Sequence, residues 1–265
     1  KAIQQISEYD IAISNWFQGI KTKQYDLRYG ENPQQNAVAL ININSFKQLS
    51  GEKKLSYNNF LDLDAAVNIA YNSKTKENIC TIIKHNIPCG GAIKKTQKES
   101  YKKAFEGDPL SAYGGIVAFN NKLSEVTAKL IIKNFYEVIA APNFEKKALE
   151  ILRTKKNLRV LKVKKFNNKV EQRSIFAGAL IQDVNNTKSS IENINGKDNL
   201  KKDKVDFFIN ILKYIKSNAI ALFDQDGLIS QSGGQTSRVD ALQNCFYKFK
   251  LKHRNKKIKR LFLFS

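Results

Sequence analysis

The amino-acid sequence predicts a layered α/β fold. Short apolar runs of strand length alternate along the chain with segments whose apolar residues recur at helical spacing. No apolar run approaches the roughly 20 residues that a membrane-spanning helix needs. With 265 residues and 42% hydrophobic content, the chain can bury one large core or two modest ones. Strands and helices that alternate in this way are typical of a sheet covered by helices.

The first predicted elements are helical. A short amphipathic helix is expected over 7–18, with Ser7 as its N-cap and Gly19 at its end. A turn-rich polar segment follows over 27–33. A second helix is expected over Asp62–Tyr71, because its apolar residues recur at a spacing of 3.6.

The middle of the chain alternates between strands and helices. The predicted strands are Ile79–Lys84, Gly115–Phe119, Val138–Ala141 and Arg159–Val163. The predicted helices are a Lys-rich stretch that ends at Phe105, Ser124–Phe135 with Ser124 as its cap, and Asn143–Leu152. Residues Pro88–Gly91, with the sequence Pro-Cys-Gly-Gly, are expected to form a turn.

The remaining elements follow a polar segment, 185–204, that is expected to be a surface loop or a connector between lobes. A helix is predicted over Val205–Lys216 and a strand over Asn218–Phe223. A turn is predicted over Asp224–Gly227 and a tight loop over Gly233–Gln235.

The net charge of +21 raises the possibility of a nucleic-acid partner. Only seven of the 45 basic residues are Arg, however, and base readout favours the bidentate Arg side chain. A solvated basic surface without a nucleic-acid or membrane partner is therefore the preferred interpretation. The last twenty residues, 246–265, contribute +8 and no acidic residue. They suit a membrane-surface or RNA-binding tail, or a segment foreign to the ancestral fold, and the last reading is favoured.

The three cysteines, Cys80, Cys89 and Cys245, are odd in number and form no C-x-x-C pair. This argues against a disulfide framework and a thiolate metal site, and it fits a reducing compartment. The start of the sequence lacks the apolar region of a signal peptide. A cytoplasmic location is therefore expected.

The pair Lys84-His85 stands at the end of a predicted buried strand, where ligands bind in open α/β sheets. His85 suits a general base, and the adjacent Lys84 ammonium disfavours a second positive charge there. A structural histidine at the end of a strand is the alternative. Arg28 and Tyr29, beside a glycine, suit a phosphate or carboxylate group, although a surface turn would have the same sequence.

Two further patterns in the sequence bear on anion binding and on metal binding. The segment 233–238 resembles an anion-binding loop that opens a helix, but a single Gly-rich loop is a weak signal. A zinc deaminase needs H-x-E followed by P-C-x-x-C. His85-Asn86-Ile87 lacks the Glu, and Pro88-Cys89 is followed by no second Cys, so this class of metal site is excluded.

Eight ordered motifs together resemble the formyltransferase domain of the bifunctional aminoimidazole-carboxamide ribonucleotide (AICAR) formyltransferase/IMP cyclohydrolase family. They are LRYGENPQQ (27–35), LSYNNFLDLDAA (55–66), IIKHNIPCG (82–90), DPLSAYGGIVAFN (108–120), EVIAAPNFEKKALEIL (137–152), RSIFAGALIQD (173–183), SNAIAL (217–222) and GGQTSRVDAL (233–242). The resemblance covers roughly residues 7–242.

The resemblance implies formyl transfer from 10-formyltetrahydrofolate, as co-substrate, to the 5-amino group of AICAR in purine (IMP) biosynthesis, with no metal required. It implies a catalytic pair in which His85 accepts the proton and Lys84 stabilises the transition state. The implied AICAR-binding residues are Arg28, Tyr29, Gly114, Glu137 and Asn218, the last reached from the partner subunit of a homodimer. The implied folate-binding residues are Arg238 and Val239. Glu137 stands where the family often has Asp, so the acid is one methylene longer.

The family's fold implies layered α/β/α architecture with two lobes similar to cytidine deaminase, without its zinc and with the second lobe incomplete. The expected organisation is a remnant of the last cyclohydrolase helix over 1–18, a first lobe over 19–170, an incomplete second lobe over 171–245 and a divergent basic tail over 246–265. Cyclohydrolase activity is not expected, because the rest of that domain is absent. The alternatives are an inactive remnant of the enzyme and, from a different class, a basic nucleic-acid-binding protein.

Overall fold

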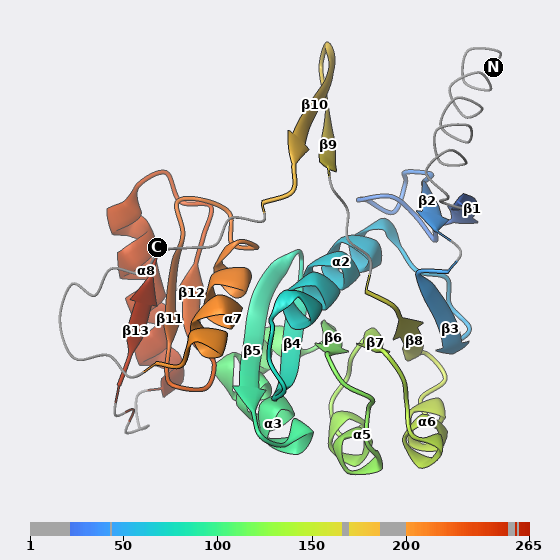
Figure 1. Ribbon diagram of the computed structural model, residues 1–265. Helices are drawn as coiled ribbons and strands as arrows, with labels where there is room; N and C mark the ends of the chain where they lie inside the picture. Colours follow the sequence, from blue (N-terminus) through green and yellow to red (C-terminus); the bar gives the residue numbers. More distant parts are fainter. Residues whose placement is uncertain (1–21, 43, 166–169, 186–199, 254–257, 259) are drawn as a thin grey trace.

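The computed structural model describes residues 22–42, 44–165, 170–185, 200–253, 258 and 260–265 (Figure 1). The predicted helix over 7–18 lies outside these residues. The strands are β1 (Thr22–Asp26), β2 (Val38–Asn42), β3 (Phe46–Ser50), β4 (Asn78–Lys84), β5 (Ile87–Lys94), β6 (Ile116–Phe119), β7 (Val138–Ala141), β8 (Arg159–Val163), β9 (Val170–Ile175), β10 (Gly178–Asp183), β11 (Ile220–Phe223), β12 (Leu228–Ser232) and β13 (Phe262–Phe264). The helices are α2 (Tyr57–Asn72), α3 (Gln97–Gly107), α4 (Pro109–Ala112), α5 (Glu125–Ile131), α6 (Lys146–Arg153), α7 (Lys202–Leu212) and α8 (Arg238–His253).

The centre of the described chain is a six-stranded mixed sheet in the order β3-β8-β7-β6-β4-β5. Helix α2 packs on one face, with α7 beside it, and the helices α3, α5 and α6 cover the other face (Figure 1). Each face has its own apolar cluster, because the strands of a doubly covered sheet bury side chains on both sides. The predicted α/β class is confirmed.

The strands β7 and β8 have the predicted bounds, and β4 and β6 differ from the predictions by one residue. The observed helix boundaries differ from the predicted ones by more residues. Helix α2 begins five residues earlier than expected, because Ser56 caps it and exchanges a capping-box pair of hydrogen bonds with Asn59. Ser124 caps α5 as predicted, but the helix ends at Ile131.

The turn predicted over Pro88–Gly91 is wrong, because these residues belong to the strand β5. This strand ends the six-stranded sheet, and proline is tolerated on such edges. Its glycines reflect close packing. A Cβ on Gly90 would lie 2.2 Å from the backbone oxygen of Ala104 in α3, and one on Gly91 would lie 2.5 Å from Ile211 in α7.

Beside the six-stranded sheet and its helices, which form the first unit, lies a second unit. It is built on a three-stranded sheet in the order β12-β11-β13. Helix α7 packs on one of its faces and α8 on the other. Phe208 of α7 stacks on Phe223 of β11 with ring centroids 4.2 Å apart, and Phe264 of β13 meets both rings edge-on. Phe208 and Phe223 also share the apolar cluster beneath α2, so one core connects the two sheets.

Two parts of the basic segment 246–265 belong to this unit. Helix α8 crosses the boundary predicted at 245/246 and continues to His253, because Ala241, Cys245, Phe249 and His253 recur every four residues and lie on the side that packs against the sheet. The interleaved lysines obscure this period in the sequence. Residues Phe262–Phe264 then pair with β11 as the antiparallel strand β13.

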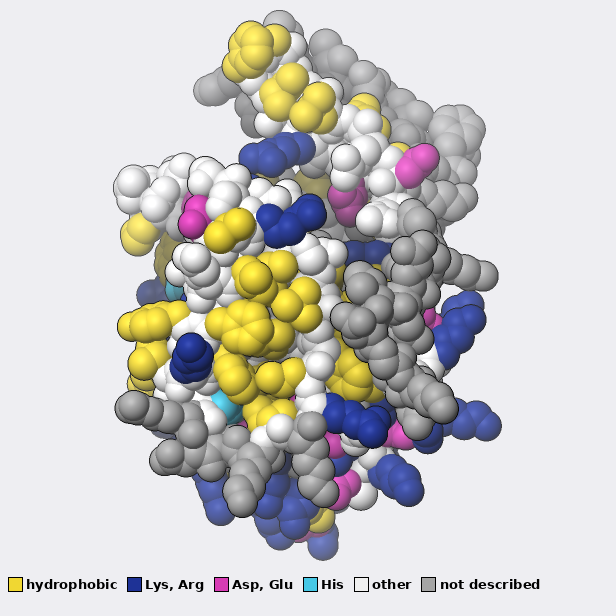
Figure 2. Space-filling model, turned by 90° about the vertical axis from the view of Figure 1, so that its left-hand side faces the viewer, with side chains coloured by type: hydrophobic (Ala, Val, Ile, Leu, Met, Phe, Trp, Pro, Cys, Tyr) yellow, Lys and Arg dark blue, Asp and Glu magenta, His cyan; other side chains and the backbone are white. Residues whose placement is uncertain are grey.

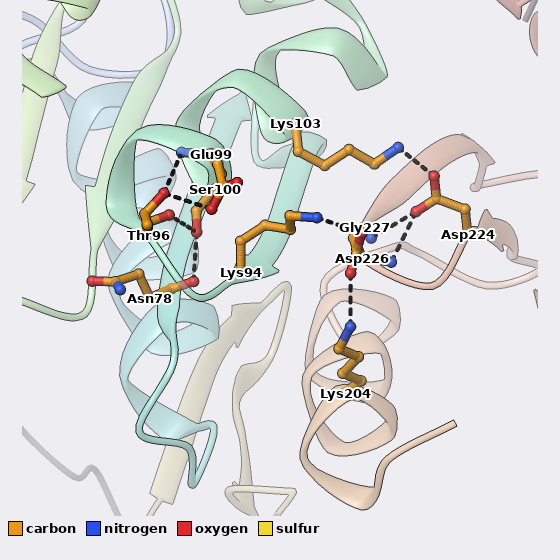
Figure 3. A network of polar contacts seen from close by, with 10 residues as sticks. All are labelled: Asn78, Lys94, Thr96, Glu99, Ser100, Lys103, Lys204, Asp224, Asp226 and Gly227. Atoms are coloured by element: carbon orange, nitrogen blue, oxygen red, sulfur yellow. Dashed lines mark hydrogen bonds and ion pairs between the residues drawn. The ribbon is translucent and has the colours of Figure 1, made fainter. Parts of the chain in front are cut away.

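Ion pairs connect the two sheets at the turn between β11 and β12 (Figure 3). The carboxylate of Asp226 accepts Lys94 of β5 at 2.8 Å and Lys204 of α7 at 2.7 Å. Asp224 of the same turn pairs with Lys103 of α3. Burial alone would raise the pKa of Asp226, but the hydrogen bonds from Lys204 and Lys94 outweigh this effect and lower the pKa below its usual value.

A carboxylate with a lowered pKa stabilises the fold above its unfolded pKa of about 3.9, and this contribution is lost as the pH falls through the folded value. We therefore expect Asp226→Asn to lower the free energy of unfolding by about 2 kcal/mol at pH 7. The difference from wild type should shrink as the pH falls below 4. Urea unfolding at both pH values measures it. Asp26→Asn is the control, because the pair of Asp26 with Lys54 is exposed and 3.8 Å long. Equal effects of the two variants would contradict the role of Asp226.

Apolar side chains remain exposed in two places. The hairpin of β9 and β10 projects from the body of the molecule (Figure 1), with Phe176, Leu180 and Ile181 exposed. Hydrophobic side chains also gather on the face that includes α8 (Figure 2), where Tyr247 and Leu251 are each 63% exposed. Among the described residues, no helix is long and apolar enough to cross a membrane.

Candidate active site

The turn between β4 and β5 consists of His85 and Asn86. Lys84 pairs with Ile87 in the antiparallel ladder, so the connection has two residues. Both have positive φ, 54° for His85 and 58° for Asn86, as a type I′ turn requires. Holding a residue other than glycine in this backbone conformation costs about 1–3 kcal/mol. Asn tolerates the conformation better than most residues. The surroundings of His85 therefore have to hold it in place.

The sheet places this turn at an edge that the sequence analysis did not anticipate. The rule that ligands bind at the carboxyl ends of strands applies to parallel sheets. Strand β4 is antiparallel to β6, with Ile83 opposite Ile116, whereas β6 and β7 are parallel. Lys84 and His85 therefore lie at the carboxyl end of β4 but beside the amino ends of β6 and β7. Gly114 and Glu137, which precede those two strands, lie along the same edge.

The first turns of α2 supply polar side chains to this edge. The Asn59 side-chain amide donates to the Glu137 carboxylate at 2.8 Å and accepts from the Arg159 guanidinium at 2.9 Å. Arg159 also pairs with Glu137 at 2.8 Å, and its side chain is only 5% exposed. All these contacts to Glu137 use Oε2. The side chain of Glu137 is 39% exposed, so Oε1 can face a ligand.

One helical turn further along α2, Asp62 contacts the backbone of the turn that contains His85. Its carboxylate accepts the backbone N–H of His85 at 3.1 Å and the backbone N–H of Asn86 through its other oxygen. Asp62 is 7% exposed. Burial raises the pKa of Asp62, and the two backbone hydrogen bonds offset only part of that rise. The nearby Glu137 carboxylate raises it further.

The backbone of Arg28 and Tyr29 is hydrogen-bonded to the residues at the start of α2. The Arg28 N–H donates to the Leu55 carbonyl at 3.0 Å, and the Tyr57 N–H donates to the Tyr29 carbonyl at 3.2 Å. The Arg28 guanidinium lies 5.2 Å from the centre of the Tyr29 ring. Arg28 is exposed and has no carboxylate partner among the described residues, so its charge can meet an anionic group.

Lys84 contacts the backbone of Tyr113, the residue that precedes Gly114. The Lys84 ammonium donates to the Tyr113 carbonyl at 2.7 Å, which leaves two of its three donors for a ligand. Gly114 has a φ of +74°, which a residue with a side chain rarely adopts, and its N–H donates to the Phe135 carbonyl at 2.9 Å. Tyr113 and Phe135 also line a cavity of about 490 Å³ beside this edge.

The other three candidates form a separate group in the second unit. The Asn218 side chain donates to the carbonyls of Gln235 and Thr236, at 3.1 and 3.2 Å. Arg238 and Val239 begin α8 directly after this loop, and both are exposed. Among the described residues, no hydrogen bond or ion pair connects this group to the first one.

The structure thus gathers Arg28, Tyr29, Lys84, Gly114 and Glu137 with His85 around the start of α2. Sequence reasoning missed three buried polar residues of this region: Asn59, Asp62 and Arg159. A signal was present, because Asn59 and Asp62 are polar and lie three residues apart on the apolar side of the helix. Among the described residues, no cluster of three or more His, Cys, Asp or Glu side chains could hold a metal ion.

Comparison with known proteins gives consistent matches. A family model described as the AICARFT/IMPCHase bienzyme matches residues 1–248. The chain is 40% identical to the bifunctional purine biosynthesis protein PurH of Prochlorococcus marinus (strain MIT 9215), over 91% of the chain and 53% of the relative. It is also 40% identical to PurH of Clostridium botulinum (strain 657), over 90% of the chain and 51% of the relative. PurH of Persephonella marina is 40% identical over 85% of the chain and 46% of the relative. The chain spans about half the length of these curated relatives.

Proposed function

Since the chain belongs to the AICARFT/IMPCHase bienzyme family, we propose that it is a purine-biosynthesis enzyme that carries the family's formyltransferase site. The reaction is transfer of the formyl group of 10-formyltetrahydrofolate to the 5-amino group of AICAR. The observation that supports this proposal is that one helix, α2, contacts both the His85 turn, through Asp62, and Glu137, through Asn59. The residues at the start of the same helix also hydrogen-bond to the backbone of Arg28 and Tyr29.

The chemistry suits these side chains. The AICAR amine is a weak nucleophile, because it is conjugated with a ring that bears a carboxamide. As its nitrogen attacks the formyl carbon, His85 accepts the amine proton and the Lys84 ammonium stabilises the developing oxyanion. The intermediate collapses when the bond from the formyl carbon to the folate nitrogen breaks. The folate nitrogen then takes up a proton, which gives formyl-AICAR and tetrahydrofolate.

The binding roles follow from charge and position. Arg28 and Tyr29 are proposed to hold the nucleotide, with the guanidinium meeting its phosphate. Gly114 and Glu137 are proposed to contact AICAR from the amino ends of β6 and β7. Glu137 is one methylene longer than the Asp that the family often has there, and Arg159 and Asn59 hold one of its oxygens.

Asn218 is proposed to reach the nucleotide in the active site of a second subunit, and Arg238 and Val239 are proposed to contact the folate. No hydrogen bond or ion pair among the described residues connects Asn218 to the group around His85, which supports this assignment, and so does the projecting hairpin of β9 and β10. A second copy would bury Phe176, Leu180 and Ile181, which otherwise stay in water.

A homodimer of this kind should depend on the hairpin. We expect the wild-type chain to sediment as a dimer and Phe176→Asp to shift it toward monomer, because the Phe176 side chain is fully exposed in one chain and an interface would bury a charge there. Analytical ultracentrifugation measures the shift. Lys95→Asp, on an exposed loop of the main body, is the matched control. A monomeric wild-type chain would contradict the shared site.

The direct test of the proposed function mixes the purified chain with AICAR and 10-formyltetrahydrofolate and follows the release of tetrahydrofolate. Release supports the proposal. A chain that is folded by circular dichroism but releases none would be an inactive remnant of the enzyme. A basic nucleic-acid binder would instead show an affinity for nucleic acid that falls steeply with ionic strength.

A further inference from the structure

Asp62 makes contacts that the proposed chemistry does not use. It is a buried carboxylate in the middle of an apolar helix face, a position where an acid is rare unless it is paired. Its partners are not side chains of opposite charge. They are two successive backbone N–H groups, those of His85 and Asn86, one to each carboxylate oxygen.

Both of these N–H groups belong to residues with positive φ. The turn needs this support because its sequence is His-Asn, without the glycine that type I′ turns favour. A carboxylate that accepts from both residues at once opposes rotation of either peptide group. Since the imidazole is attached to the first of these residues, the carboxylate also determines where the ring can lie.

The same helix also holds Glu137. Asn59, three residues before Asp62, donates to the Glu137 carboxylate and is itself fixed by the capping box with Ser56. Two adjacent turns of α2 therefore hold two parts of the site that are far apart in sequence, the His85 turn and the amino end of β7. Catalysis by a proton acceptor is sensitive to small displacements of the accepting group, so a helix that fixes both parts matters for the reaction.

We propose that Asp62 is a positioning residue that holds the His85–Asn86 turn so that His85 faces the substrate amine. The assignment rests on the proposed formyl transfer. Asp62 does not touch the reacting atoms in this scheme. It acts through the backbone of His85, and α2 provides the rigid frame that links it to Glu137.

The test uses Asp62→Asn in the full chain. The substitution preserves size, but the amide has one acceptor oxygen for two N–H groups. We expect kcat for formyl transfer to fall by about 10- to 100-fold, while KM for AICAR changes little because Asp62 does not bind the nucleotide. Asp62→Glu, which restores two acceptor oxygens, should recover part of kcat. Asp64→Asn is the matched control, since Asp64 accepts from the side chain of Asn68 on the same helix and, among the described residues, has no hydrogen bond to the His85 turn.

Wild-type kcat in Asp62→Asn, or an equal loss in Asp64→Asn, would overturn the assignment. A second readout separates it from the proposed function. In amide NMR spectra, Asp62→Asn should shift the N–H resonances of His85 and Asn86 selectively, and Asp64→Asn should not. If the wild-type chain transfers no formyl group, the proposed function fails. The spectra then decide on Asp62, and unshifted resonances overturn its role.

Discussion

Replacing His85 with glycine is expected to lower kcat for formyl transfer by about 10²- to 10⁴-fold, the usual contribution of a positioned general base. Glycine is the informative substitution because it adopts the positive φ of this turn without strain and keeps the N–H that Asp62 accepts. The loss can then be attributed to the imidazole rather than to a broken hairpin. Tetrahydrofolate release at saturating AICAR measures it.

Two controls accompany this variant. Added imidazole should restore part of the activity of His85→Gly, because the missing ring leaves space in the turn. The thermal unfolding midpoint should stay close to that of the wild type, since His85 is exposed. Activity that persists in His85→Gly would show that another group accepts the proton. The assignment of the base would then be wrong even if the reaction is correct.

Replacing Gly90 with alanine is expected to lower the free energy of unfolding by about 3 kcal/mol. The added Cβ would lie 2.2 Å from the backbone oxygen of Ala104, and a backbone atom cannot move aside as a side chain can. Helix α3 would have to shift away from β5. For a chain of this size the unfolding midpoint should fall by roughly 6–12 °C, which differential scanning calorimetry measures.

The matched control is Gly178→Ala in the hairpin of β9 and β10. A Cβ there meets nothing within 4 Å, although the φ of +153° still disfavours alanine. Gly178→Ala therefore carries the cost of a positive φ without a clash, whereas Gly90→Ala carries the clash without a positive φ. The loss of stability in Gly178→Ala should be the smaller of the two. Equal losses in the two variants would mean that α3 does not pack against β5 as closely as described.

Hydrophobic patterning was enough to predict most of the sheet. The mostly apolar runs at 79–84, 115–119, 138–141 and 159–163 are β4, β6, β7 and β8 within one residue, because a strand buried on both faces is predominantly apolar. Helix ends were less certain. The start of α2 depends on the cap at Ser56, and α8 continues into a segment whose lysines hide its period.

The ordered motifs in the sequence by themselves determined the family, and the apolar periodicity determined the α/β class, because both are properties of neighbouring residues. Only the tertiary structure decided which way β4 runs in the sheet and where its turn lies. Strand polarity depends on the partner strand, and a His-Asn turn lacks the usual glycine signal. Only the tertiary structure brought Asn59 to Glu137 and Arg159, residues 78 and 100 positions away, and Asp62 to His85. Buried polar groups must find hydrogen-bond partners wherever the packed chain brings them, and that pairing is not encoded in local spacing.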